Sequence, residues 1–183
     1  MYKCIDANLY ANIPVTDARK KAWLGEDTEA YERVLPMYAN IKFGRMSSAN
    51  NTMDNDYPLM RASEMYLIEA EGLARAGQIG KAQDVLFEFV SHRNPSYVKS
   101  TKTGDAFIDE VYFQRRIELW GEGFSYVDHK RLKKGIVRDY TGTNHNADAR
   151  KNFDAGASVF KFRIPDAETN SNKGIPATEN NPI

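Results

Sequence analysis

Two apolar stripes at helical spacing, separated by one glycine, are the feature that most constrains the fold of this chain. From about Pro58 to Arg75, apolar and small side chains recur with the spacing of one helix face. The positions of this stripe are Leu59, Ala62, Tyr66, Ala70, Leu73 and Ala74. Gly77 then provides a helix stop, and a second apolar stripe runs from Gln78 to about His92. The pattern predicts two helices that fold back on each other as a hairpin.

Charged side chains support the first helix of this hairpin. Asp56 is placed to cap its start. Arg61 with Glu64, and Glu71 with Arg75, stand at helical i,i+3 and i,i+4 spacing. Opposite charges at these spacings attract each other along a helix. The hairpin is as long as one tetratricopeptide repeat of about 34 residues, so we predict a tetratricopeptide-like scaffold with a single clear repeat.

A third helix is predicted from about Asp105, and it carries a charged residue inside its apolar stripe. Arg115 lies in register with apolar positions on both sides. A buried guanidinium is stable only when it is paired and hydrogen-bonded. Glu118 and Glu122 follow one and two turns later, and Glu69 of the hairpin is another candidate partner.

Gly121 and Gly123 break or bend this third helix before a shorter helix from about Ser125 to Lys133. In the shorter helix Asp128 and Arg131 share one face. We therefore predict a structural ion-pair network along the helices. Its members are Arg61, Glu64, Glu69, Arg115, Glu118, Glu122, Asp128 and Arg131.

The rest of the chain is predicted to be irregular, so the fold class is mainly α with long irregular loops. We predict one domain with an irregular arm over residues 1–55, a helical scaffold over 56–135 and a loop-rich segment over 136–183. Within the arm, Tyr38–Phe43 carries alternating apolar residues and predicts a short strand or an extended segment.

Composition argues against several function classes. Lys and Arg total 25, and so do Asp and Glu, so no overall charge attracts nucleic acid. Cys4 is the only cysteine, which excludes a disulfide within the chain and a multi-cysteine metal site. The histidines at 92, 129 and 145 lack zinc-type spacing, and we predict no metal and no cofactor. The chain has no apolar run of about 18 residues and no secretory signal.

Paired carboxylates are the only candidates for catalysis. Glu118 with Glu122, and Glu64 with Glu71, have the side chains that a glycosidase uses. Arginines bracket each pair at helical spacing, however, and this arrangement favours plain ion pairs. We therefore predict no catalytic residue and no enzyme activity.

Trp23 is the one candidate ligand-binding residue. It stands among charged residues at positions 20, 21, 26 and 27. A flat aromatic ring in a polar setting can stack on the C–H face of a sugar. The alternative, which we favour, is that Trp23 packs in a small apolar cluster.

Several blocks of this sequence, taken in order, resemble the C-terminal part of SusD/RagB-family proteins. A short Asp-x-Arg segment, Asp17–Arg19, and a closing pattern with an Ile-Pro pair, Glu168 and a late Asn-Pro pair add to the resemblance. Gln114 departs from it, since the family usually has glutamate before the paired arginines. The blocks are Asp56–Glu71, Ala76–Ala82, Gln114–Phe124 and Asp128–Arg131.

The resemblance implies a function that the residues alone do not specify. Family members are exported lipoproteins that bind an oligosaccharide or another nutrient at the outer-membrane surface of Bacteroidetes, as partners of TonB-dependent transporters. By resemblance, this chain is expected to supply mostly scaffold and transporter-contact helices of a non-enzymatic binding subunit. It also looks like a fragment without the family's N-terminal half.

A second function class fits the hairpin by itself. A small helical-repeat adaptor could hold a peptide in the groove of such a hairpin. Repeat proteins need about three stacked units for stability, and one recognisable hairpin argues against this alternative.

Overall fold

The structure is a computed structural model, and it describes residues 3–25, 35–43, 58–176, 178 and 180. The chain divides into two compact units, Met1–Gly123 and Phe124–Ile183. Each unit is described by itself. The single-domain organisation expected from the sequence stays a prediction.

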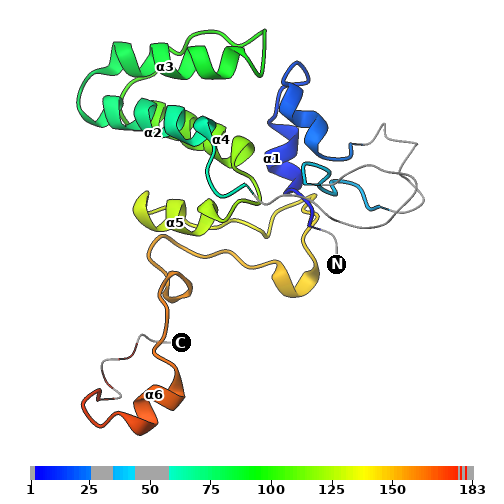
Figure 1. The fold of residues 1–183 in the computed structure, drawn as a ribbon. Helices are drawn as coiled ribbons and strands as arrows, with labels where there is room; N and C mark the ends of the chain where they lie inside the picture. The colour runs from blue at the N-terminus through cyan, green and yellow to red at the C-terminus, as the bar shows by residue number, and fades with distance from the viewer. Residues whose placement is uncertain (1–2, 26–34, 44–57, 177, 179, 181–183) are drawn as a thin grey trace. The chain divides into compact units, whose positions relative to one another are not determined.

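The first unit contains the predicted hairpin and the third helix that packs on it (Figure 1). Helix α2 packs against both α3 and α4. In chain order the helices of this unit are α1 (Ala7–Ala11), the 3-10 helix η1 (Ala18–Ala22), α2 (Ala62–Arg75), α3 (Ile79–Ser91) and α4 (Gly104–Glu118).

The turn between α2 and α3 has the predicted glycine stop. Gly77 has φ 77°, a left-handed conformation that glycine adopts without the cost a Cβ would add. The Gly77 amide donates to the Ala74 carbonyl at 3.1 Å, and the Gln78 amide donates to that of Leu73 at 2.9 Å. These bonds satisfy carbonyls that the end of α2 leaves open, so the chain reverses directly into α3.

Packing of the three helices buries a continuous apolar core. The fully buried side chains include Leu67 on α2, Leu86 and Val90 on α3, and Phe107 and Val111 on α4. Burial of one such side chain stabilises the fold by about 1.5–3 kcal/mol, so these contacts hold the hairpin and α4 together.

The predicted start and buried face of α2 were wrong. The helix begins at Ala62, after Pro58, and the candidate cap Asp56 lies outside the described residues. Leu59 is 83% exposed. The residues of α2 that are buried are Ser63, Leu67, Ala70 and Glu71. Ser63 bonds to Glu118 on α4, and Glu71 pairs with Arg75 on the same helix. Burial of these two polar side chains shifts the buried face away from the apolar stripe.

The N-terminal part of the first unit forms a second apolar cluster. Asp6 caps α1 by accepting from the Leu9 amide at 2.8 Å. Tyr38–Phe43, predicted as a short strand or extended segment, makes isolated antiparallel bridges, in which Ala39 pairs with Cys4 and Asn40 with Trp23. The buried members of this cluster are Ile5, Leu9, Ile13, Trp23 and Ile117.

The second unit consists of short helical turns joined by loops; the sequence predicted the first of these turns but none of those after residue 136. Its elements are α5 (Phe124–Arg131), η3 (Ala147–Ala149), η4 (Ser158–Phe160) and α6 (Asp166–Ser171). The Tyr126 hydroxyl donates to the Phe160 carbonyl at 2.8 Å, and this bond ties α5 to η4.

The fold class predicted from the sequence is confirmed. Within the described residues the regular structure is helical, and β pairing is limited to isolated bridges. In the same part of the chain, no helix has both the length and the apolar character that a bilayer crossing requires.

Candidate functional site

Seven charged residues of the first unit gather around the C-terminal end of α4. We call this group the charged cluster, and its centre is Glu118, which is 5% exposed. Arg61 Nη1 donates to Glu118 Oε1 at 3.0 Å, while Arg19 and Arg93 lie 3.4 and 3.5 Å from Oε2. Three cations from distant parts of the chain therefore surround one carboxylate. The cluster consists of Asp17, Arg19, Lys42, Arg61, Arg93, Glu118 and Glu122.

Glu122 is the second acidic centre of the charged cluster. Arg61 donates to both of its carboxylate oxygens, Nε to Oε2 at 3.0 Å and Nη2 to Oε1 at 2.7 Å. Lys42 Nζ pairs with Glu122 Oε1 as well, and it donates to the Glu118 carbonyl at 2.7 Å. Through these bonds the arm residue Lys42 is held to the end of α4.

Electrostatics shifts the titration of three groups in this cluster. Burial raises the pKa of Glu118, but Arg19, Arg93, Ser63 and Arg61 outweigh it and hold the pKa below its ordinary value. Burial lowers the pKa of Lys42, and Glu122 only partly offsets that effect. For Arg61 burial also acts downward, but Glu122 and Glu118 raise its pKa. A depressed carboxyl pKa is the opposite of what a general acid needs at neutral pH.

Asp17 and Arg19 connect the N-terminal segment to this cluster. Arg19 donates to both oxygens of Asp17, at 3.0 Å from Nε and 2.6 Å from Nη2. It also donates to the side-chain oxygen of Gln114. The sequence pointed to this segment only through its Asp-x-Arg pattern. It gave no local signal for Lys42 or Arg93, because their partners are far away in the chain.

The structure brings together three of the eight residues predicted for the network: Arg61, Glu118 and Glu122. Arg115 is buried on α4, 5% exposed. Glu64 and Glu69 have no side-chain hydrogen bond or ion pair among the residues that the structure describes, so the proposed Arg61–Glu64 pair is absent there. In the second unit, Arg131 Nε donates to Asp128 Oδ1 at 2.7 Å, an i,i+3 pair within α5.

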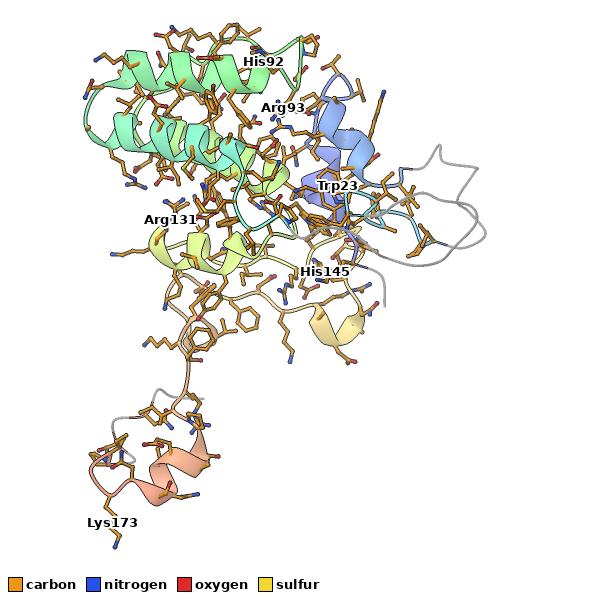
Figure 2. The ribbon with its side chains drawn as sticks, in the orientation of Figure 1. Trp23, His92, Arg93, Arg131, His145 and Lys173 are labelled. Carbon is orange, nitrogen blue, oxygen red and sulfur yellow. The ribbon has the colours of Figure 1, made fainter. Side chains whose placement is uncertain are left out.

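Trp23 lies inside the N-terminal apolar cluster and is 3% exposed (Figure 2). Its ring meets that of Trp120 edge to face, with centroids 5.7 Å apart and planes at 86°. The indole N–H is buried and has no hydrogen-bond partner among the described residues. No ring face is open to a sugar, so this burial favours the packing alternative, and sugar stacking stays an untested prediction.

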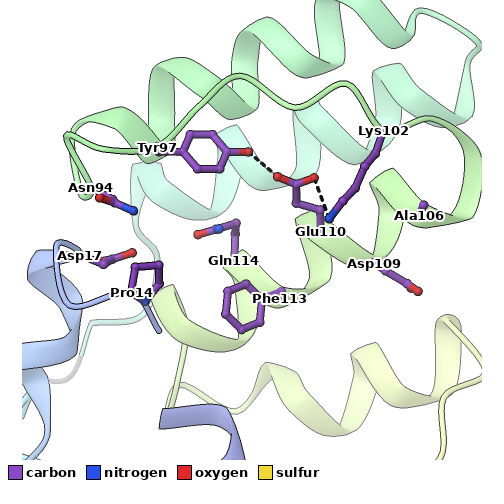
Figure 3. Close-up of a pocket in the computed structure, with 10 residues that line it drawn as sticks. All are labelled: Pro14, Asp17, Asn94, Tyr97, Lys102, Ala106, Asp109, Glu110, Phe113 and Gln114. Atoms are coloured by element: carbon purple, nitrogen blue, oxygen red, sulfur yellow. Dashed lines mark hydrogen bonds and ion pairs between the residues drawn. The ribbon is translucent and has the colours of Figure 1, made fainter. Parts of the chain in front are cut away.

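A pocket of about 330 Å³ lies between α4, the segment after α3 and the N-terminal segment (Figure 3). Glu110 on α4 accepts from the Tyr97 hydroxyl at 2.6 Å and from the Ser100 hydroxyl at 2.7 Å. Burial and then Glu110 raise the pKa of Tyr97 far above its ordinary value, so this phenol stays protonated. The lining residues are Pro14, Asp17, Asn94, Tyr97, Lys102, Ala106, Asp109, Glu110, Phe113 and Gln114.

A second pocket of about 300 Å³ lies on the α2–α3 hairpin. Tyr66 and Phe89 stack there with ring centroids 5.9 Å apart, and Arg93 lies 5.0 Å from the Phe89 centroid. His92 lies at the end of α3, beside this pocket. In the described part of the chain, no group of three or more His, Cys, Asp or Glu side chains is placed to hold a metal ion.

Comparison with known families decides the identity of this fold. Residues 24–182 match the SusD family. The chain belongs to the SusD family. The matched range includes the helical hairpin and α4.

Solved structures of SusD-like proteins share this fold. A SusD-like carbohydrate binding protein from Bacteroides vulgatus is 25% identical, with a TM-score of 0.70 over 94% of this chain and 41% of that one. A SusD superfamily protein from Bacteroides thetaiotaomicron is also 25% identical, with a TM-score of 0.73 over 96% of this chain and 39% of that one.

A further protein from Bacteroides vulgatus is 27% identical, with a TM-score of 0.74 over 98% of this chain and 39% of that one. This SusD-family chain therefore spans about two fifths of the length of these relatives. A comparison with curated proteins finds no match.

Proposed function

We propose that this chain is part of a non-enzymatic glycan- or nutrient-binding subunit that works with a TonB-dependent transporter at the surface of the outer membrane. The observation that carries the proposal is the match to the SusD family over residues 24–182. The SusD-like carbohydrate binding protein that shares the fold supports carbohydrate as the ligand class. Since the chain spans two fifths of that relative, ligand capture and transporter binding belong to the whole protein.

Within this subunit, we assign mainly a scaffold role to helices α2–α4. The charged cluster supports that role. Distant cations pair with Glu118 and Glu122, and Arg19, two residues away, pairs with Asp17. Ion pairs that are buried and hydrogen-bonded on several sides fix relative positions. The cluster therefore keeps the N-terminal segment and the hairpin in one arrangement.

The same unit has exposed apolar side chains that are candidates for partner contact. Met60 is 79% exposed, and Ile68 on α2 is 50% exposed. Exposed apolar side chains that form one patch mark protein contact surfaces. We assign the transporter contact to this part of the unit.

Titration of an oligosaccharide panel into the purified chain, and into a longer protein that contains it, tests the ligand class. We expect the longer protein to bind at least one oligosaccharide saturably. A longer protein that binds none of the panel would overturn the proposal. If the chain instead bound extended peptides on its hairpin, the helical-repeat adaptor would replace it.

Co-purification from outer membranes tests the transporter contact. We expect Met60→Glu with Ile68→Glu in the longer protein to reduce recovery of a TonB-dependent transporter. Lys81→Glu, at an exposed position on α3, is the matched charge change away from this surface and should leave recovery unchanged. Equal recovery of the transporter with both variants would show that the contact does not lie on this surface.

A further inference from the structure

The pocket between α4 and the N-terminal segment contains two buried amides that each have a free end. Asn94 and Gln114 are both 5% exposed, and both line the pocket. Figure 3 shows them on the same side of the pocket as Asp17 and Pro14. A volume of about 330 Å³ lies at the lower end of the range of about 300–1,000 Å³ for small-molecule sites.

Neighbouring donors set which way these amides point. Arg19 Nη2 donates to Gln114 Oε1, and the Ser96 amide donates to Asn94 Oδ1 at 3.1 Å. A guanidinium and a backbone N–H can only donate, so each side chain must present its oxygen to them and its NH₂ group elsewhere. Neither NH₂ group has a hydrogen-bond partner among the described residues. The pocket is therefore lined by two side-chain NH₂ groups that donate to no described residue, on residues that are otherwise buried.

Both NH₂ groups are reached by solvent, because in the described part of the chain the Trp23 indole N–H is the one buried side-chain polar atom without a partner. A donor that is open to solvent at a pocket can donate to a ligand oxygen in place of water. The first requirement on the ligand is thus an acceptor.

The Glu110 carboxylate, one turn before Gln114 on α4, adds a requirement for a donor on the ligand. Glu110 accepts from Tyr97 and Ser100, and Lys102 lies 3.4 Å from it. A carboxylate has about four lone-pair sites, so Glu110 can accept from a ligand hydroxyl as well. Asp17, also on the lining, has the same acceptor chemistry. The ligand must therefore both donate and accept, as a hydroxyl group does.

The remaining lining favours a neutral ring over an ion. Pro14, Phe113 and the Tyr97 ring supply apolar surface, and sugar C–H groups pack on such surfaces. Arg19 neutralises Asp17, and Lys102 neutralises Glu110, so these pairs leave little net charge to attract an ionic ligand. Hydroxyls together with an apolar face are the chemistry of a neutral sugar ring.

We propose that this pocket binds one neutral sugar unit, with the Asn94 and Gln114 NH₂ groups donating to its oxygens and Glu110 accepting from a hydroxyl. The proposal rests on the proposed function, since it places one carbohydrate subsite within this chain. It goes beyond the scaffold role, because these residues contact ligand directly.

Two near-isosteric substitutions test the donors in the full chain. Gln114→Glu and Asn94→Asp keep the oxygen that faces Arg19 or the Ser96 amide, and each replaces the NH₂ group with an acceptor. The matched control is Gln78→Glu, an exposed amide whose oxygen accepts from Lys81. Neutral mono- and oligosaccharides are titrated into each variant, and binding is followed by calorimetry and by the side-chain NH₂ signals in NMR spectra.

We expect the wild-type chain to bind a neutral sugar and to shift the NH₂ signals of Asn94 and Gln114. Each pocket variant should bind about tenfold more weakly or worse, and Gln78→Glu should match the wild type. Melting temperatures separate loss of binding from loss of folding. If Asn94→Asp fails to fold, Gln114→Glu and the wild-type NMR shifts still decide the question.

Three results would overturn the subsite. They are sugar binding with unchanged affinity in both pocket variants, no NH₂ shift with any panel sugar, and preference for a cationic amino sugar over its neutral counterpart. The first leaves the proposed function intact, since the glycan then binds elsewhere. If the longer protein binds a glycan and the chain alone binds none, the proposed function also remains and the subsite is overturned. Failure of both proteins to bind any oligosaccharide removes both proposals.

Discussion

Arg61 holds Glu122 with two hydrogen bonds, at 3.0 and 2.7 Å, although 61 residues separate them in the chain. Paired bonds between a planar guanidinium and a carboxylate fix orientation as well as distance. The same guanidinium reaches the Glu118 carboxylate at 3.0 Å and its carbonyl at 2.6 Å. One side chain just before α2 thus sets the position of the end of α4.

Removal of the Arg61 guanidinium should destabilise the first unit substantially. Arg61→Met leaves Glu122, whose side chain is 4% exposed, with Lys42 as its cationic partner among the described residues. Breaking a buried pair typically costs about 3–5 kcal/mol. Because the Arg61 side chain is 27% exposed, we expect a smaller loss of about 2–3 kcal/mol, measured by urea unfolding.

Lys99→Met is the control for this loss. Lys99 pairs with Asp84, and the two side chains are 44% and 67% exposed; such surface pairs contribute about 0–1 kcal/mol. Equal losses for the Arg61 and Lys99 variants would show that the charged cluster has no special structural role.

Acid should weaken the first unit through Glu118. Its folded pKa is depressed, so it binds protons less readily in the folded than in the unfolded state. Its contribution to stability is present above the unfolded pKa, about 4.3 for Glu, and is lost as the pH falls through the folded value. We expect the free energy of unfolding of the wild type to fall more steeply below about pH 4 than that of Glu118→Gln. Urea unfolding over a pH series measures this, and parallel curves would contradict it.

Local patterns predicted the parts of this structure that depend on near neighbours. Gly77 ends α2 with a left-handed φ, and Arg115 is buried in the apolar stripe of α4 as predicted. Glu71 pairs with Arg75 at i,i+4 spacing. In each case the interaction or the burial follows from helical period within a few residues.

The rest of the charged cluster depends on contacts between distant segments. Lys42 meets Glu122 across 80 residues, and Arg19 meets Glu118 across 99. A sequence gives spacing only along the chain, so Arg61 was paired with nearby Glu64. The sequence did not predict the pocket amides for a related reason. Asn94 follows the end of a helix pattern, and Gln114 stands out only as a departure from the family pattern.

Trp23 should act as a core residue whose indole N–H is dispensable. Trp23→Ala is expected to cost about 3–5 kcal/mol, as large-to-small core substitutions do. Trp23→Phe should cost much less, because it keeps aromatic packing and removes an N–H that has no partner in the described residues. Urea unfolding measures both. A similar loss for the two variants would indicate that the N–H is bonded after all.

The Trp23→Phe variant also separates packing from sugar stacking. With a buried ring, we expect its glycan affinity to equal that of the wild type in the longer protein. A large loss of affinity with unchanged stability would instead support the stacking role.

Gly121 is the position where a single methyl group should be most harmful in the turn after α4. Its φ is 77°, and a Cβ there would lie 2.7 Å from Phe43 Cε2. Both the backbone conformation and the contact oppose a side chain. We expect Gly121→Ala to lower the free energy of unfolding by about 1–3 kcal/mol, measured by urea unfolding.

Two further variants separate the two causes of this loss. Phe43→Ala in the Gly121→Ala background removes the steric contact, so the added alanine should cost less there than in the wild type, by a double-mutant cycle. A methyl group added at Gly72 on α2 would meet no atom of a neighbouring segment within 4 Å, and Gly72→Ala should stabilise the helix by about 0.5–1 kcal/mol. If Gly121→Ala were as stabilising as Gly72→Ala, the left-handed turn that presents Glu122 to Arg61 would not be required by the fold.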